Sequence, residues 1–148
     1  MAGSSITFSL QGAERLLARL NRLGRVDRGM MEAVAAVGES QTRRRIQSEK
    51  RNPDGAPWPP WSRSYAATRG AQHSLLINEG HLLDSLTHDA DSTEAVWGTN
   101  LIYAATHQFG DRDRHVPPRP FLGLSAENEA EILAVIEDWI ERDWRGAT

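Results

Sequence analysis

The chain has 148 residues, a mass of 16.5 kDa and a formal net charge of −3, and this length fits a single domain with its own core. It has no cysteine, which excludes a disulfide framework, a thiolate metal site and a cysteine nucleophile. No run approaches the roughly 18 apolar residues that a membrane span needs, and the start of the chain lacks the features of a secretory signal. We therefore expect no membrane segment, and a reducing cytoplasm fits the composition.

Charge is distributed unevenly along the chain. Residues 13–51 carry ten basic and five acidic side chains, whereas residues 126–148 carry seven acidic and two basic ones. Lys50 is the single lysine, and the other sixteen basic residues are arginines, whose planar fork suits carboxylate partners and interfaces. A GC-rich coding genome would also explain this preference. A basic front half and an acidic tail can pair within the fold or between subunits.

The first third of the chain predicts one strand and two helices. Residues 6–10 alternate apolar and polar side chains, as a half-buried strand does. Leucines at helical spacing then indicate an amphipathic helix that ends at Gly24; they are Leu16, Leu17, Leu20 and Leu23. A longer helix is predicted from Asp27 to about Lys50, and Gly38 weakens its middle.

Residues 52–62 predict a stiff extended arm. The turn signal Asn52-Pro53-Asp54-Gly55 comes first, because proline presets φ and glycine accepts a positive φ. The next segment, Ala56-Pro57-Trp58-Pro59-Pro60-Trp61, holds three prolines and two tryptophans, a composition that disfavours a helix or a central strand. Ser62 is placed to cap a short helix over residues 65–67.

The second half of the chain predicts several short elements. Residues 81–86 suit one or two helical turns, and residues 86–91 and 94–99 are typical of paired strands around a polar turn. A helix over residues 101–109 closes at a glycine, and a charged loop covers residues 111–118.

A short strand over residues 121–124 and a long C-terminal helix complete the pattern. Ser125 caps this helix, whose apolar side recurs at i, i+3, i+4 and i+7; it comprises Ile132, Val135, Ile136, Trp139, Ile140 and Trp144. Short strands and segregated helices predict an α+β class. We expect one domain over residues 1–148, with a small antiparallel sheet of about four strands packed with a long helix and the C-terminal amphipathic helix.

A series of short motifs follows one order along the chain. The motifs are Pro53-Asp54-Gly55-Ala56-Pro57-Trp58, Leu82-Leu83-Asp84-Ser85-Leu86, Gly98-Thr99-Asn100, Tyr103-Ala104, His107-Gln108-Phe109-Gly110 and Arg119-Pro120-Phe121-Leu122-Gly123-Leu124-Ser125. Each is weak alone. Their order and spacing over roughly residues 5 to 144 resemble the virion morphogenesis (tail-completion) family of tailed bacteriophages.

The resemblance implies a structural virion protein of the neck or of the head-proximal tail end, without catalytic residues or cofactors. Relatives are similar to head–tail joining proteins, in which a sheet and a long helix assemble as rings. We therefore expect a homo-oligomer, a hexameric ring in this setting, that is assembled in the bacterial host cytoplasm and contacts neighbouring neck and tail proteins. Genomic DNA would pass through it or touch it weakly. The alternatives left open are tail completion, a head–tail connector and a terminator ring that caps the tail tube.

Aromatic and arginine side chains in the motifs are the candidates for contacts between subunits or rings. Large rings on a stiff arm lose little entropy when they dock, although Trp58 and Trp61 could equally fold back on their own core. Tyr103 and His107 lie four residues apart on one helical face, and Phe109 is expected to pack. The full set of interface candidates is Trp58, Trp61, Tyr103, His107, Phe109, Arg119, Phe121 and Trp144.

Three other functions compete with this interpretation. The cluster Arg43, Arg44 and Arg45 could contact DNA phosphates, which reward clustered cations, although a solvated or salt-bridging patch fits the acidic chain better. A small hydrolase could use His107 as a base, but no nucleophile accompanies it. A metal site would draw on His107, Asp111, Asp113 and His115, whose spacing matches no established zinc pattern. We expect neither catalytic nor metal-binding residues.

Overall fold

The computed structural model describes residues 4–9, 27–71, 73–77 and 80–146. Within them, an antiparallel three-stranded sheet has the order β1–β3–β2, built from β1 (Ser4–Ser9), β2 (Thr87–Ala90) and β3 (Glu94–Thr99). The helices are α2 (Arg28–Arg44), α3 (Arg63–Ala66), α4 (His81–Ser85), α5 (Ala104–Phe109) and α6 (Ala126–Gly146). The α+β class predicted from the sequence is confirmed. The helix predicted over Leu16 to Leu23 lies outside the described residues.

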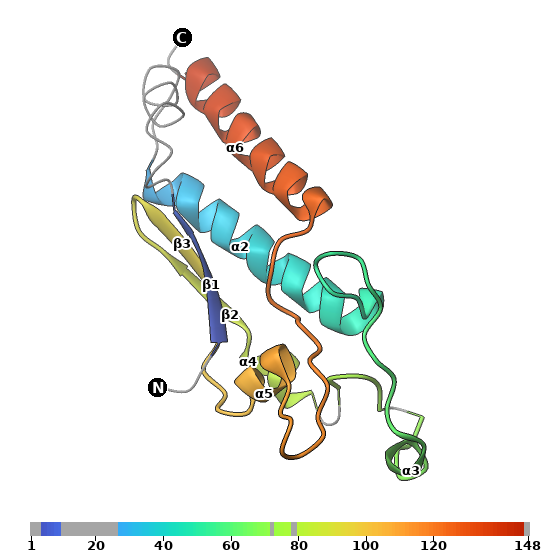
Figure 1. Cartoon of the computed structure of the whole chain (residues 1–148). Helices are drawn as coiled ribbons and strands as arrows, with labels where there is room; N and C mark the ends of the chain where they lie inside the picture. The colour runs from blue at the N-terminus through green and yellow to red at the C-terminus, as the bar shows by residue number, and fades with distance from the viewer. Residues whose placement is uncertain (1–3, 10–26, 72, 78–79, 147–148) are drawn as a thin grey trace.

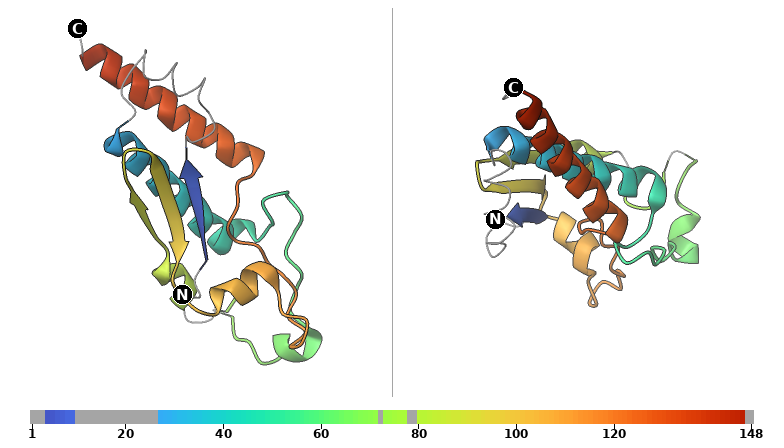
Figure 2. Two further views of the ribbon diagram at one scale, coloured as in Figure 1. Left: turned by 60° about the vertical axis from the view of Figure 1, so that its left-hand side comes forward. Right: turned by 90° about the horizontal axis from the view of Figure 1, so that it is seen from above.

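Helix α2 lies between the sheet and α6 (Figure 1; Figure 2). It begins at Asp27, whose Oδ1 accepts a hydrogen bond from the N–H of Met30 at 2.9 Å, an N-cap that satisfies one of the free donors of the first turn. After α2, one π-helical turn (Arg45–Glu49) leads to Lys50, which ends the helix in the left-handed conformation with φ 54°. The long helix predicted from Asp27 to about Lys50 is confirmed. In the described part of the chain, no helix combines the length and the apolar character needed to cross a bilayer.

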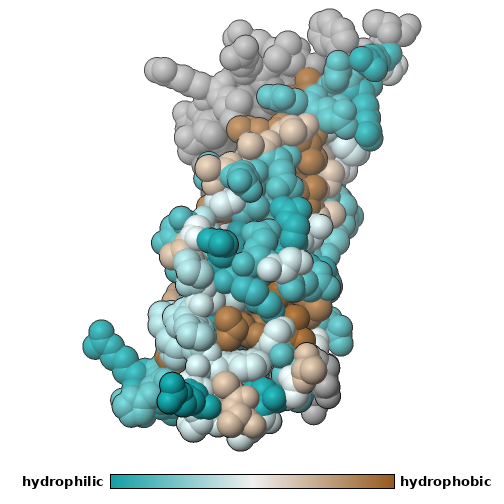
Figure 3. All heavy atoms as spheres, turned by 90° about the vertical axis from the view of Figure 1, so that its right-hand side faces the viewer, coloured by the Kyte–Doolittle hydropathy of each residue, from teal (hydrophilic) through white to brown (hydrophobic). Residues whose placement is uncertain are grey.

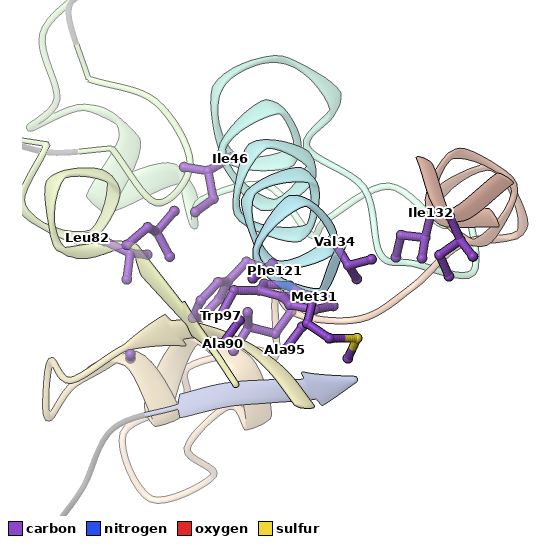
Figure 4. Close-up of a cluster of buried hydrophobic side chains, with 14 of the residues drawn as sticks. Met31, Val34, Ile46, Leu82, Ala90, Ala95, Trp97, Phe121 and Ile132 are labelled. Atoms are coloured by element: carbon purple, nitrogen blue, oxygen red, sulfur yellow. The ribbon is translucent and has the colours of Figure 1, made fainter. Parts of the chain in front are cut away.

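The core gathers between α2 and the sheet (Figure 4). Trp97 in β3 is 1% exposed, and its indole lies directly against Gly38 in α2, where an added Cβ would come within 2.3 Å of the ring. Glycine has a low helix propensity, but its missing Cβ at position 38 lets the largest core side chain approach the helix backbone. Further buried side chains in the figure are Met31, Val34, Ile46, Leu82, Ala90, Ala95, Phe121 and Ile132.

The strand predicted over residues 121–124 is wrong, so the described sheet has three strands instead of about four. The side chain of Gln108 provides the hydrogen-bond partners that a neighbouring strand would have provided. Its Oε1 accepts hydrogen bonds from the N–H groups of Phe121 and Leu122 at 3.1 and 3.0 Å, and its Nε2 donates to the carbonyl of Leu122 at 2.9 Å. Gly123 has φ 149°, and an added Cβ would lie 2.4 Å from Pro53. The segment is thus apolar in sequence but irregular in backbone.

Arg45 is the buried link between α2 and this segment. It is 2% exposed, and its Nη1 donates to the carbonyls of Phe121 and Gly123 at 2.9 and 3.1 Å, while Nη2 donates to Oδ1 of Asn128. Burial lowers the pKa of Arg45, but an arginine stays charged at neutral pH. Asn128 and Ser125 also bond each other's N–H groups at 3.0 Å, which confirms the predicted cap. The end of α2 therefore fixes the start of α6.

Replacing Arg45 with methionine keeps an unbranched apolar stem but leaves two backbone carbonyls and the Asn128 side chain without their donor. Each buried acceptor that loses its partner costs roughly 1–3 kcal/mol, so we expect Arg45→Met to lower the free energy of unfolding in urea by about 3 kcal/mol or more. Arg44→Met is the matched control, because Arg44 pairs with Glu49 and Glu131 at the surface and should contribute less than about 1 kcal/mol. Equal losses in both variants would contradict this role of Arg45.

His88 in β2 joins the sheet to α2 through two carboxylates. Its Nδ1 lies 3.0 Å from Oε2 of Glu39, and its Nε2 lies 2.9 Å from Oε1 of Glu32. Partial burial of His88 disfavours the charged imidazole, but the two carboxylates outweigh this effect and raise its pKa above the usual value. A base whose pKa is higher in the folded state stabilises the fold below its unfolded pKa, and this contribution is lost as the pH rises through the folded pKa.

His88→Gln should therefore be most destabilising below about pH 6.5. The difference in free energy of unfolding between the parent and the variant should shrink as the pH is raised through the elevated pKa of His88 into the alkaline range. Urea denaturation of both proteins over this range measures the difference directly, and the other histidines cancel because both proteins carry them. A difference that does not change with pH would show that the two carboxylates do not hold a charged imidazole.

Candidate docking cleft

A cleft with a volume of about 1180 Å³ is lined by residues of α3, α4 and α5 and of the loops beside them, and these elements lie at one end of the molecule (Figure 1). The end of the arm and α3 form one wall, residues 74–77 with His81 and Leu82 form the floor, and α5 with the 111–118 loop forms the other wall. Aromatic and basic side chains dominate the lining: Trp61, Tyr65, Arg69, His81, Tyr103, His107, Arg112, Arg114, His115 and Arg119. Among the described side chains that line the cleft, Asp111 is the acidic one. The cleft therefore has a basic character.

Two side chains hold the arm against the rest of the protein: a tryptophan of the arm itself and an arginine that faces it. Trp58 is 4% exposed, and its Nε1 donates a hydrogen bond to the carbonyl of Pro120 at 3.0 Å. Arg119 donates through Nε to the carbonyl of Pro59 at 2.8 Å and through Nη2 to the carbonyl of Pro60 at 3.1 Å. The proline-rich segment has few N–H groups, so Arg119 holds it through two carbonyl oxygens, while Trp58 anchors it through its own indole N–H.

Trp61 ends the arm in the wall of the cleft. Its ring meets the ring of Tyr65 edge-on, with 5.8 Å between the centroids, and the guanidinium of Arg69 lies 4.6 Å above the centre of Tyr65. Oγ of Ser62 accepts a hydrogen bond from the N–H of Tyr65 at 3.3 Å, which starts α3 as the sequence predicts. Of the two tryptophans in the arm, Trp58 belongs to the core, while Trp61 remains half-buried and faces the cleft.

Two further cations, near the end of α2, hold the floor of the cleft and the end of α4 that follows it. Arg43 donates to the carbonyls of Leu83 and Leu86 at 2.9 and 3.0 Å. Lys50 donates through Nζ to Oγ of Ser74 at 3.0 Å and to the carbonyl of Leu75 at 2.7 Å. Burial lowers the pKa of Lys50 to about 8, a value at which the amine is still mostly protonated at neutral pH.

The 111–118 loop projects from the end of α5 as a closed unit. Gly110 ends α5 with φ 76°, and an added Cβ would lie 2.8 Å from both the carbonyl of Val116 and the nitrogen of Pro118. Asp111 and Val116 exchange two backbone hydrogen bonds of 2.8 Å. The carboxylate of Asp111 accepts from Nε of Arg114 at 2.7 Å, and this bond together with backbone N–H groups lowers the pKa of Asp111. The charged loop predicted over residues 111–118 therefore has a defined conformation that its own hydrogen bonds hold.

His107 lies in the cleft wall with its ring edge-on to Tyr103, at 5.7 Å between centroids, so the predicted pair on one helical face is confirmed. Burial, followed by the charge of Arg119, lowers the pKa of His107, which keeps the imidazole neutral at neutral pH. Its Nδ1, the atom that a carboxylate would orient in a catalytic triad, is buried and has no hydrogen-bond partner among the described residues. The hydrolase alternative thus lacks an orienting group there.

Metal binding finds no support in the same part of the chain. Within the described residues, no three histidine, aspartate or glutamate side chains are grouped so that they could hold a metal ion. Of the proposed ligands, Asp111 is engaged with Arg114 in the loop.

The structure separates the sequence-based interface candidates into three groups. Trp61, Tyr103 and His107 line the cleft. The expectation that Phe109 packs is wrong, because Phe109 at the end of α5 is 75% exposed; as an accessible apolar ring it suits an interface. Phe121, with no exposed surface, belongs to the core and is unavailable to a neighbour in this fold.

Arg119 and Trp144 differ from the other interface candidates. Arg119 lines the cleft but is 7% exposed, and its guanidinium is used to hold the arm. Trp144 belongs to α6, but its side chain lies outside the described part of the structure. Its role in the core or in an interface therefore stays a prediction.

The three arginines proposed as a DNA-phosphate patch point to different parts of the fold. Arg43 donates to carbonyls at the end of α4, Arg44 pairs with acidic side chains at the surface, and Arg45 is buried. Consecutive residues of a helix project in directions about 100° apart, so adjacency in sequence does not create a shared surface. The phosphate hypothesis requires three free guanidinium groups on one face, and this arrangement does not provide them.

Sequence reasoning missed the polar side chains that hold the irregular segments. Gln108 satisfies the backbone of residues 121–122, and Asn128 links Arg45 to the cap of α6. Gln41 donates through Nε2 to the carbonyl of Asn128 at 3.1 Å. The spacing Ser125-x-x-Asn128 was an available signal, because a polar residue three positions after the cap can return a hydrogen bond. No comparable pattern marks Gln108.

Comparison with known sequences identifies the class of protein. The profile of the phage virion morphogenesis family matches residues 8–141, and the chain therefore belongs to this family. Its members are phage structural and assembly proteins.

Two relatives resemble the chain over most of its length. A protein named "Mu-like prophage FluMu G protein 2" from Haemophilus influenzae is 29% identical over 144 residues, which cover 92% of this chain and 96% of the relative. "Putative capsid assembly protein G" of Escherichia phage Mu is 34% identical over 134 residues, which cover 82% of this chain and 86% of the relative. No solved structure matches the chain significantly.

Arg119→Met should release the arm and open one wall of the cleft. Two carbonyls lose a charged donor, and hydrogen bonds to charged groups contribute about 1.5–3 kcal/mol, so we expect the free energy of unfolding to fall by about 2 kcal/mol. Hydrogen exchange of the Trp58 indole N–H, followed by NMR, should become faster than in the parent. Arg112→Met is the matched control: it removes an exposed arginine from the same cleft and should change neither quantity. Exchange of the indole N–H as slow in Arg119→Met as in the parent would contradict this role of Arg119.

Proposed function

We propose that this protein is a ring subunit in the neck or at the head-proximal tail end of a phage particle, where it completes the tail or joins it to the head. The observation that carries the proposal is the match to the virion morphogenesis family over residues 8–141, in a chain whose family motifs also build the cleft walls. The segment around His107-Gln108-Phe109-Gly110 forms one wall, and Arg119 with Pro120 holds the other.

A passive assembly role suits the way in which the cleft is built. Arg43, Lys50 and Arg119 hold its floor and wall through backbone carbonyls, so the docking surface is formed before any partner arrives. A preformed surface loses less conformational entropy when it binds. Ile102, just before α5, is 76% exposed, and Phe109 is 75% exposed. Apolar side chains of this kind supply contact area for a neighbouring subunit.

Ring formation by identical copies requires a heterologous contact, in which one surface of a copy meets a different surface of the next copy. Such contacts close into a ring when the rotation between neighbours divides a full turn. The hexameric ring is expected from the setting of the family, and the chain would meet neighbouring neck and tail proteins through the faces of that ring. Genomic DNA would pass through the opening, where it has no need of tight contact.

A role in the capsid is the second candidate. The phage Mu relative carries capsid assembly in its name, and a neck protein acts at the junction between head and tail. The two roles differ in the stage at which particle formation stops when the protein is missing.

Deletion of the gene from a phage that encodes it tests these roles. We expect electron micrographs of the lysate to show filled heads and tails of normal length that remain unjoined, and we expect the wild-type gene supplied in trans to restore infectious particles. Tails of uncontrolled length would favour a terminator ring instead, since a terminator stops growth of the tube. Malformed or missing heads would favour the capsid role. Normal infectious particles without the protein would overturn the proposal.

A further inference from the structure

We propose that the basic cleft of one copy receives the outward face of α6 from a second copy of this chain. The inference rests on the proposed ring and names the two surfaces that would form its repeating contact. It is carried by the complementary charge of these surfaces and by their separation on the molecule.

The outward face of α6 is a narrow acidic and apolar surface, here called the α6 stripe. Ile132 and Ile136 on the inner side of the helix are 2% and 4% exposed, whereas Leu133 on the outer side is 51% exposed. Residues around Leu133 at helical spacing are small or acidic and exposed. The α6 stripe comprises Ala126, Ala130, Leu133, Ala134, Glu137 and Glu141. Small side chains beside a leucine allow close approach of a partner surface.

The charges of the two surfaces are complementary. Arg69, Arg112 and Arg114 line the cleft, against Asp111 as the acidic residue of the described lining. In the described part of the chain, neither the side chain of Arg112 nor that of Glu137 has an ion-pair partner. Glu137 in the α6 stripe could therefore meet Arg112 of a neighbour without first breaking an existing pair.

The apolar parts of the two surfaces also match in kind. Tyr103 is 44% exposed and Tyr65 is 47% exposed, and both rings line the cleft. An exposed leucine and a row of alanines can pack against such rings while carboxylates at the edge of the helix reach the arginines. Aromatic and arginine side chains are the residues most enriched at binding hot spots.

The cleft and the α6 stripe do not meet within one molecule. The cleft lies at the end that carries α3 and α5, and α6 runs toward the other end (Figure 1; Figure 2). A contact between them must join two copies, and because the two surfaces differ, a pair of copies still has one free cleft and one free stripe for further neighbours. This geometry builds rings or open chains.

A largely hydrophilic surface indicates that this contact is weak in isolation. The face in Figure 3 is mainly hydrophilic, with hydrophobic patches that are small and separated. Stable obligate dimers bury broad apolar surfaces, whereas the cleft and the α6 stripe both mix apolar with charged side chains. The contact should therefore depend on charge and weaken when added salt screens the ion pairs.

The experiment is sedimentation velocity of the purified chain over a range of concentrations at low salt. We expect the parent to associate beyond the dimer, and Arg112→Glu in the cleft or Glu137→Arg in the stripe to weaken this association at least tenfold. An equimolar mixture of the two variants should recover association, because each contact then pairs an arginine with a glutamate. Recovery in the mixture requires that cleft and stripe belong to different copies.

Matched controls keep the test specific. Arg63→Glu makes the same charge change on α3, where residue 63 does not line the cleft, and Asp138→Arg makes the same change on α6 beside the stripe at the cost of an exposed pair with Arg142. Both controls should associate like the parent. A parent that stays monomeric throughout, controls that lose association as strongly as the variants, or a mixture without recovery would overturn this inference. The proposed neck function would still stand if the deletion leaves heads and tails unjoined.

Discussion

Basic side chains that donate to backbone carbonyls hold this fold together outside its helices and strands. A buried carbonyl needs a donor, and the segments around residues 75 and 121–123, like the last turn of α4, lack a complete ladder of their own to supply one. Lys50, Arg43 and Arg45, all near the end of the α2 helix, reach these segments, and the buried Arg45 also fixes the cap of α6. Charged donors form the stronger hydrogen bonds, so one end of a helix can organise three separate pieces of chain.

The cleft follows from this arrangement. Its floor is fixed by α2, and its outer wall is fixed by Arg119, which binds the proline-rich arm in the same manner. The arginine content of the chain therefore has two uses. Buried or half-buried guanidinium groups replace missing secondary structure, whereas exposed ones such as Arg112 give the cleft its charge. A cleft built in this way suits the assembly role proposed above, and the neutral His107 in its wall contributes packing.

Regular elements could be predicted from the sequence, whereas the polar links could not. The periodicity of α2 and α6, the turn between β2 and β3 and the caps at Ser62 and Ser125 are local signals, and the structure has all of them. The strand predicted over residues 121–124 does not form, because the backbone of this segment bonds to the side chains of Gln108 and Arg45 and not to a neighbouring strand. These side chains are distant in sequence, so no local pattern reveals them. Phe109 was expected to pack because it is apolar, but burial depends on tertiary neighbours. The motif around residues 107–110 and the arm were named as candidate interface segments, but the sequence did not show that they line one cleft, because this depends on the tertiary fold.

The central claim is that this preformed basic cleft joins copies of the chain in the neck of a virion. An electron cryomicroscopy map of intact particles of a phage that encodes the protein tests it most directly. The account predicts a ring of this chain between head and tail, in which α6 of each copy lies in the cleft of its neighbour. A neck without this polypeptide, or a ring in which every cleft faces solvent, would contradict it.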